Sequence, residues 1–137
     1  MKTFGVCLTL IMMVLTMGCS EDWVTTESGL KFKDLELGEG QEAKQGMLVE
    51  VYYSGWLYEK SKRGKCFDST GTGSPYLFTL GIGQVIKGWD EGIKGMRVGG
   101  KRELMIPSDL AYGEWGAGGV IPPKATLNFE VELIGVK

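Results

Sequence analysis

Few residue types in this chain can do chemistry, and most of those are aromatic. The 137 residues include no histidine, which excludes the usual general base, every histidine-containing triad and the common zinc sites. Cys66 has no histidine to activate it, and no strand precedes a Gly-Lys-Ser/Thr phosphate loop. The remaining candidates for a cavity are Tyr53, Phe67, Asp68, Tyr76, Phe78, Trp89, Tyr112 and Phe129. This set predicts an apolar, aromatic pocket with few polar groups.

A short helix around Trp89, over residues 85–93, is the expected centre of the domain. Apolar residues recur there at three- and four-residue spacings, which is typical of one buried helix face. They are Val85 or Ile86, Trp89, Ile93 and Met96. Glycines within the segment each cost roughly 1 kcal/mol against alanine, so packing must hold the helix. Taken alone, Trp89 is either a core residue or the floor of a pocket.

The other regular segments alternate apolar and polar residues, as half-buried strands do. They cover residues 30–37, 47–58, 76–80, 101–106 and 126–136. Polar residues 59–65 are expected to form a loop, and residues 108–125 a long loop with unusually large apolar side chains. No βαβ spacing occurs, so the pattern predicts one antiparallel α+β domain over residues 30–137.

The N-terminal segment reads as a targeting signal. An apolar run from Phe4 to Met17 follows Lys2 and ends at Gly18-Cys19, which resembles a bacterial lipoprotein signal. We therefore expect a signal peptide over residues 1–18, lipidation of Cys19 and a polar tether over residues 19–29. A plain secretory signal or an uncleaved anchor are the alternatives. Ser20 after the cysteine resembles outer-membrane sorting, and the expected location is the bacterial cell envelope.

Charge and cysteine content limit the partners. The formal net charge is −2, and the one dense basic cluster, residues 60–65, falls in the expected loop. We interpret that cluster as a solvated tip and expect no nucleic-acid binding. Once Cys19 carries lipid, Cys66 is the only thiol of the domain, so no internal disulfide is expected.

Several short motifs, in order, resemble the FK506-binding-protein family (FKBP) of peptidyl-prolyl isomerases. They are residues 51–55, 67–69, 85–89, 111–113, 121–123 and 125–133, which read VYYSG, FDS, VIKGW, AYG, IPP and ATLNFEVEL. The resemblance extends from about Gly29 to the C-terminus. It implies a five- to six-stranded curved antiparallel sheet wrapped around one short helix. It also implies isomerase activity on proline-containing polypeptides without a cofactor, and FK506-type macrolides as candidate ligands.

The resemblance also implies roles for individual residues. Trp89 corresponds to the pocket floor, and Asp68 and Tyr112 to polar groups at the rim. The expected walls are Tyr53, Phe67, Tyr76, Val85, Ile86 and Phe129, with Val120 and Ile121 in a loop that covers the substrate. Asp68 either pairs with the Tyr53 hydroxyl or assists the twisted amide, and both interpretations stay open. Leu110 replaces a frequent tyrosine of the family, a departure that bears on substrate preference and rate more than on the reaction itself.

Isomerisation suits such a residue set because no covalent bond is broken. Rotation about a peptide bond faces a barrier of about 18–20 kcal/mol, and cis and trans X-Pro differ by roughly 1 kcal/mol. A dry pocket favours the twisted amide, whose carbonyl is less polar. The competing hypotheses are a binding module that grips proline or apolar peptides without turnover, and a structural or adhesive lipoprotein.

Overall fold

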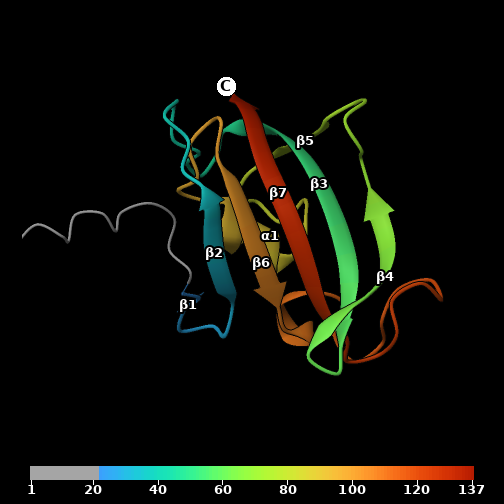
Figure 1. Ribbon diagram of the computed structural model, residues 1–137. Helices are drawn as coiled ribbons and strands as arrows, with labels where there is room; N and C mark the ends of the chain where they lie inside the picture. The colour runs from blue at the N-terminus through green and yellow to red at the C-terminus, as the bar shows by residue number, and fades with distance from the viewer. Residues whose placement is uncertain (1–21) are drawn as a thin grey trace, which may run out of the picture.

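The chain folds as a curved antiparallel sheet around one short helix (Figure 1). The computed structural model describes residues 22–137; the expected signal peptide, Cys19 and the first tether residues lie outside them. The strands are β1 Val24–Thr25, β2 Lys31–Glu36, β3 Leu48–Glu59, β4 Lys62–Ser69, β5 Tyr76–Thr79, β6 Lys101–Ile106 and β7 Thr126–Val136. The helix α1 spans Lys87–Ile93, and a short 3-10 turn spans Ser108–Leu110.

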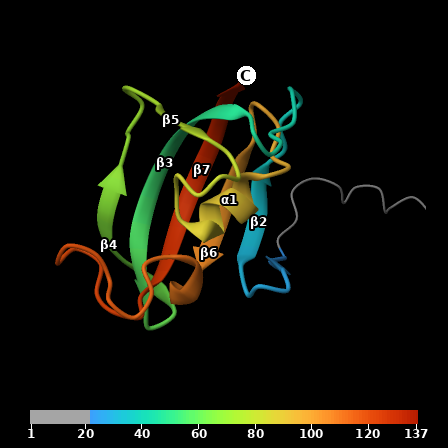
Figure 2. The ribbon, with the colours of Figure 1, turned by 180° about the vertical axis from the view of Figure 1, so that it is seen from behind.

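The strands follow the order β1-β2-β6-β7-β3-β4, and β5 pairs with the first half of β3. All pairings are antiparallel. Figure 2 shows α1 lying across the concave side of this sheet. The predicted antiparallel α+β arrangement is therefore confirmed. No helix within residues 22–137 is long and apolar enough to span a membrane.

The sheet has seven strands rather than the expected five to six, because two polar segments join it. β1 lies inside the segment that we expected to be a tether and pairs with β2. The expected loop over residues 59–65 is wrong: β3 runs to Glu59 and β4 begins at Lys62. Lys60 and Ser61 both have positive φ angles, as a tight two-residue hairpin turn requires. Exposed lysines on an edge strand protect it from pairing with other chains.

The core lies between the concave face of the sheet and α1. Alternate residues of β7 are buried, as the sequence predicted, and they are Leu127, Phe129, Val131 and Leu133. The helix supplies Trp89 and Ile93 to the same core. Full burial of each such side chain stabilises the fold by about 1.5–3 kcal/mol.

Two glycines bring α1 unusually close to β6. A Cβ at Gly88 would lie 2.5 Å from Ile106 Cγ2, and one at Gly92 would lie 2.7 Å from Leu104 Cδ2. Both distances are too short for real carbon contacts, so only glycine fits at this depth. The glycines that weaken the isolated helix are thus what allows it to pack. The helix begins at Lys87, later than expected, because the preceding Ile86 is extended (ψ 153°).

A polar network covers the face of the sheet opposite the helix. Arg63 of β4 donates from Nε to Asn128 Oδ1 and from Nη2 to Glu130 Oε2 at 2.6 Å. The same Nη2 lies 3.3 Å from Glu103 Oε2, and the guanidinium stacks 3.8 Å from the Trp56 ring centroid. Asn128 is fully buried and donates to Glu103 at 3.0 Å. The network ties the edge strand β4 to β3, β7 and β6.

Candidate active site

A cavity of about 580 Å³ opens between α1, β3, β4, β5 and the segment after β6. This volume lies within the range of small-ligand pockets. Its lining residues are Tyr53, Phe67, Asp68, Tyr76, Gln84, Val85, Ile86, Trp89, Ala111, Tyr112 and Phe129. Nine of the twelve pocket residues expected from the sequence line it. Phe78 does not, because it is buried in the core beneath (2% exposed).

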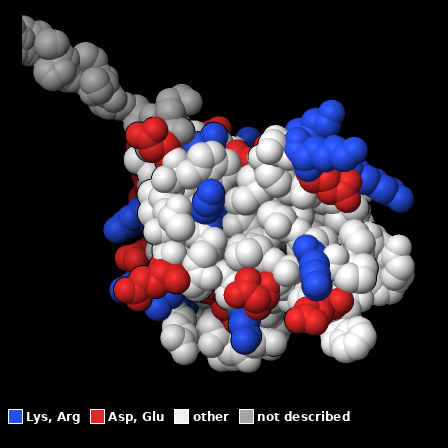
Figure 3. All heavy atoms as spheres, turned by 90° about the horizontal axis from the view of Figure 1, so that it is seen from below, with Lys and Arg blue, Asp and Glu red and all other residues white. Residues whose placement is uncertain are grey.

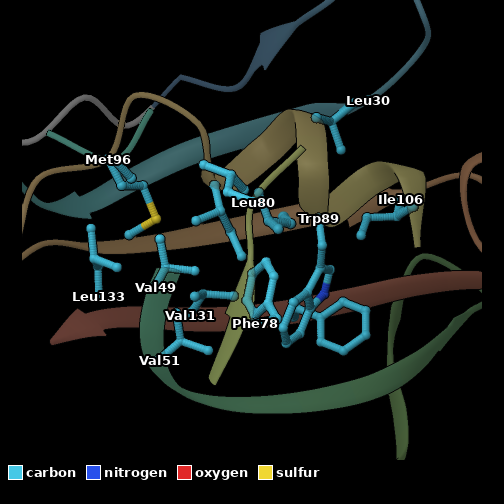
Figure 4. Close-up of a cluster of buried hydrophobic side chains, with 14 of the residues drawn as sticks. Leu30, Val49, Val51, Phe78, Leu80, Trp89, Met96, Ile106, Val131 and Leu133 are labelled. Atoms are coloured by element: carbon cyan, nitrogen blue, oxygen red, sulfur yellow. The ribbon is translucent and has the colours of Figure 1, made fainter. Parts of the chain in front are cut away.

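Trp89 forms the floor of the cavity and is only 4% exposed. Figure 4 shows its side chain reaching from the helix toward the sheet, beside Phe78. The rings of Tyr53 and Phe129 meet the indole edge-on, with centroids 4.8 and 5.3 Å away and interplanar angles of 82° and 84°. Such edge-to-face pairs are each worth about 0.5–1.5 kcal/mol beyond burial. The two earlier interpretations of Trp89 are therefore both correct, because it is a core residue that also lines the pocket.

The indole Nε1–H of Trp89 is buried and has no hydrogen-bond acceptor among residues 22–137. A buried unpaired donor costs about 1–3 kcal/mol.

Gly55 of β3 makes room for the aromatic wall. A Cβ at this position would lie 2.6 Å from Phe129 Cε1 and 2.9 Å from Phe67 Cζ. Phe67 and Phe129 themselves pack edge-on with centroids 5.6 Å apart. Any side chain at Gly55 would have to push these two rings into the cavity. The sequence contains Gly55 within the VYYSG motif, but its contact with two distant rings appears only in the structure.

The polar rim centres on one short hydrogen bond. The Tyr53 hydroxyl donates to Asp68 Oδ2 at 2.5 Å, while the Asp68 side chain stays at the exposed edge of β4. Burial, and then the adjacent Asp68 carboxylate, raise the pKa of Tyr53 far above its ordinary value. The pKa of Tyr112 is raised for the same two reasons, burial first. Both phenols therefore stay neutral and can donate hydrogen bonds at physiological pH.

Val120 and Ile121 do not line the cavity. Ile121 is 6% exposed, and its backbone exchanges two hydrogen bonds with Ala117. Val120 and Trp115, by contrast, are 52% and 91% exposed on the same loop. The loop that we expected to cover the substrate reaches the cavity wall through Ala111 and Tyr112 instead.

Gln84 and Ala111 are lining residues that we did not expect. The Gln84 side chain turns back so that its Oε1 accepts from the Thr79 N–H at 2.8 Å. Its neighbours Val85 and Ile86 belonged to a recognised motif, but nothing in the sequence indicated this fold-back. Ala111 directly precedes Tyr112 in the AYG motif, so that motif was the available signal.

The arrangement suits a neutral ligand group better than a charged one. Aromatic and branched side chains form the floor and walls, and the ionised carboxylate of Asp68 is engaged by Tyr53. Figure 3 shows acidic and basic side chains interspersed around a largely uncharged centre on one face of the molecule. A planar, apolar ring fits such a cavity, with the Tyr112 hydroxyl at the rim as a donor for a neighbouring carbonyl.

The fold and the cavity together define the class of FKBP-fold isomerases, and three comparisons agree. The family model for FKBP-type peptidyl-prolyl cis-trans isomerase matches residues 39–134. An FK506-binding protein of Neisseria meningitidis serogroup B is 56% identical over 108 residues, covering 79% of this chain and 96% of that protein. The peptidyl-prolyl cis-trans isomerase FPR2 of Saccharomyces cerevisiae is 57% identical over 96 residues, covering 69% of each chain.

A solved structure is similar over nearly the whole described part of the chain. FkpA from Escherichia coli is 42% identical with a TM-score of 0.76, covering 86% of this chain and 53% of that one. This chain thus spans about half the length of that FkpA chain. With the family model and the two relatives, the match shows that the chain belongs to the FKBP-type peptidyl-prolyl cis-trans isomerases.

Proposed function

We propose that this isomerase accelerates X-Pro isomerisation in exported polypeptides while a lipid on Cys19 holds it at the cell envelope. The observation that carries the enzymatic part is the aromatic cavity floored by Trp89, with the Tyr53–Asp68 hydrogen bond at its rim. The envelope location rests on the apolar run that ends at Gly18-Cys19.

The cavity lowers the rotational barrier by treating the planar and twisted amides differently. The proline ring rests on Trp89, and the apolar walls remove the water that stabilises the polar, planar amide. The twisted amide loses resonance, so its carbonyl needs less solvation. The Tyr112 hydroxyl and the Ile86 N–H are placed to hold the flanking carbonyls. Asp68 orients Tyr53 and contributes its negative charge at the rim.

A binding module without turnover is the competing function, and one assay separates the two. A protease-coupled assay with a Leu-Pro peptide, using the full chain in detergent, measures the rate of cis-to-trans conversion. We expect acceleration that saturates with peptide and is inhibited by an FK506-type macrolide. Peptide binding without any acceleration would establish the binding module instead.

Substrate choice is proposed to depend on the exposed apolar residues of the loop after β6. Trp115 and Val120 face solvent there, where they can cover the residue before proline. Full burial of a leucine gains about 1.5–3 kcal/mol, and a charged residue gains none. We expect Leu-Pro to exceed Glu-Pro by about one to two orders of magnitude in turnover, since only part of the gain persists in the twisted state. Trp115→Ala should reduce that preference, and equal turnover of both peptides in the wild type would contradict it.

The lipid anchor is tested separately from the activity. Cys19→Ala should move the protein from the detergent fraction to the soluble fraction, or stall its processing, and should abolish labelling by palmitate. Several acyl chains bind a bilayer stably at about 0.8 kcal/mol per buried methylene. An unlabelled wild-type chain whose membrane association survives Cys19→Ala would contradict the lipoprotein assignment. Ser20 after the cysteine supports the outer membrane as the destination, and membrane fractionation tests it.

A further inference from the structure

The segment between β5 and α1 forms one wall of the cavity through Gln84, Val85 and Ile86. Its first residue, Leu80, is held by backbone hydrogen bonds with Gly46 and Met47. After Leu80, side-chain acceptors replace backbone carbonyls as the hydrogen-bond partners of this segment's amides. The hydrogen bonds that backbone N–H groups of residues 81–86 donate go to a single side chain, that of Asp90.

The Asp90 carboxylate accepts hydrogen bonds from two backbone amides of this segment. Its Oδ1 accepts from the Gly81 N–H at 2.8 Å, and its Oδ2 accepts from the Gly83 N–H at 3.0 Å. Gly81 and Gly83 have φ angles of +85° and +83°, a region that favours glycine. Hydrogen bonds to an ionised acceptor are roughly twice as strong as neutral ones. Asp90 therefore selects one conformation of a segment that glycines would otherwise leave adaptable.

Asp90 also connects this segment to the pocket floor. It is the residue after Trp89, and its own backbone N–H donates to the Ile86 carbonyl at 3.2 Å. One residue of α1 thus holds the start of the segment by its side chain and the end by its backbone. The helix itself cannot shift easily, because Gly88 and Gly92 seat it against β6. The Trp89 backbone N–H also donates to the Ile86 carbonyl at 2.9 Å, and Gln84 Oε1 accepts from the Thr79 N–H. Asp90 adds the two hydrogen bonds that fix the glycine-containing start of the segment.

We propose that Asp90 is a positioning residue for isomerase turnover, acting through Gly81 and Gly83 to hold the Val85–Ile86 wall over the Trp89 floor. This inference rests on the proposed isomerase function. Asp90 does not line the cavity. Its contribution is the preorganisation of a wall that the twisted amide needs, and small displacements of such walls cost turnover steeply.

A graded series of variants tests this role. Asp90→Asn keeps the shape and one acceptor for the two amides, and Asp90→Ala keeps none. Glu91→Gln is the matched control, because it removes the same charge one residue along the helix. Glu91 accepts from Ser28 at 2.6 Å rather than from an amide of the segment, and the glutamine oxygen preserves that acceptor.

We expect kcat/KM for a Leu-Pro peptide to fall about tenfold or more in Asp90→Ala, less in Asp90→Asn, and less than about twofold in Glu91→Gln. The loss should lie mainly in kcat, because the floor that binds the proline ring remains. Amide hydrogen exchange at Gly81 and Gly83 should accelerate in the same order. A merely structural role would lower the melting temperature without this ordered change in the folded protein.

Three results would overturn the proposal. One is folded Asp90→Ala with turnover equal to that of Glu91→Gln. Another is hydrogen exchange at the wild-type Gly81 and Gly83 amides that is as fast as at unprotected amides. This second result needs no variant, so it applies even if Asp90→Ala does not fold. The third is a wild-type chain without isomerase activity, which removes the proposed function itself and is recognised before any variant is compared.

Discussion

The two faces of the sheet differ in the residues that they carry and in how those residues interact. The concave face meets the helix with aromatic rings, and its rim has one principal side-chain hydrogen bond, Tyr53 to Asp68. The opposite face carries Arg63, Glu103, Asn128 and Glu130 in a connected set of charged and amide groups. The first arrangement lines a cavity with aromatic rings, and the second pairs Arg63 with Glu103 and Glu130 across neighbouring strands. We therefore expect turnover to depend on the concave face and the stability of the edge strand to depend on the other.

Replacement of the floor should give the largest loss of activity. Trp89→Leu keeps an apolar core residue but removes the flat surface under the proline ring, so kcat/KM should fall roughly 100-fold. The loss should be similar for Leu-Pro and Glu-Pro peptides, because both share that ring. Leucine should cost less stability than the about 3–5 kcal/mol of a truncation to alanine. Turnover is measured on protein whose melting curve is cooperative, and a loss confined to one peptide would contradict a shared floor.

The opposite face should respond in the reverse sense. Arg63→Ala leaves the buried Oδ1 of Asn128 without a donor and removes one ion pair of Glu103, which costs about 1–3 kcal/mol of unfolding free energy. Turnover at 25 °C should stay within about twofold, because Arg63 is not part of the cavity wall. Urea denaturation measures the first effect and the peptide assay the second. Lys62→Ala on the same strand is the control and should change neither. A folded Arg63→Ala variant with unchanged unfolding free energy and a loss of turnover well beyond twofold would contradict the contrast between the faces.

Much of this contrast could be predicted from the sequence, because alternation identifies strands whose one face is buried. Phe129 and Leu127 were placed correctly by that pattern, and Trp89 by helical spacing. β4 was missed because its residues are mainly charged, and the pairing that defines it depends on β3. Arg63 was assigned to a solvated tip, since its partners lie 40 to 67 residues away along the chain.

Site residues that lie in short sequence motifs could also be predicted, whereas those defined by contacts between distant parts of the chain could not. Motifs gave eight of the expected lining residues because short sequence runs carry them, and Tyr76 came from an alternating strand. Gly55, Gln84 and Asp90 were missed because their roles arise from contacts with rings or amides that no local pattern specifies. Val120 and Ile121 were placed by resemblance, and the fold of their loop turns Ile121 into the core.

Alkaline pH should destabilise the concave face in particular, because the tyrosines with raised pKa values, Tyr53 and Tyr112, line its pocket. The folded pKa of Tyr53 lies above its ordinary value of 10.0, so the folded state keeps a proton that the unfolded state loses. Stability is therefore fully present below about pH 10 and falls as the pH rises further. Melting temperatures between pH 8 and pH 11 should decline more steeply for the wild type than for Tyr53→Phe. Parallel declines would show that Tyr53 ionises normally.

The smallest effect is expected at Cys66, which is exposed on the edge strand beside Phe67. Its thiol makes only a long contact, 3.6 Å, to the Asp68 carbonyl, and serine can donate there too. Cys66→Ser should leave turnover and melting temperature nearly unchanged. A large loss of turnover in the folded variant would reveal a role for the thiol in the cavity.

The central claim is that the aromatic cavity accelerates rotation rather than merely binding proline. Exchange NMR on an uncleaved Leu-Pro peptide reports both processes in one sample, through shifts on binding and through cis–trans exchange rates. The account predicts that catalytic amounts of the full chain in detergent will accelerate exchange, and that Trp89→Leu will abolish most of this acceleration. Binding shifts centred on Trp89 with an exchange rate equal to that of the free peptide would contradict it.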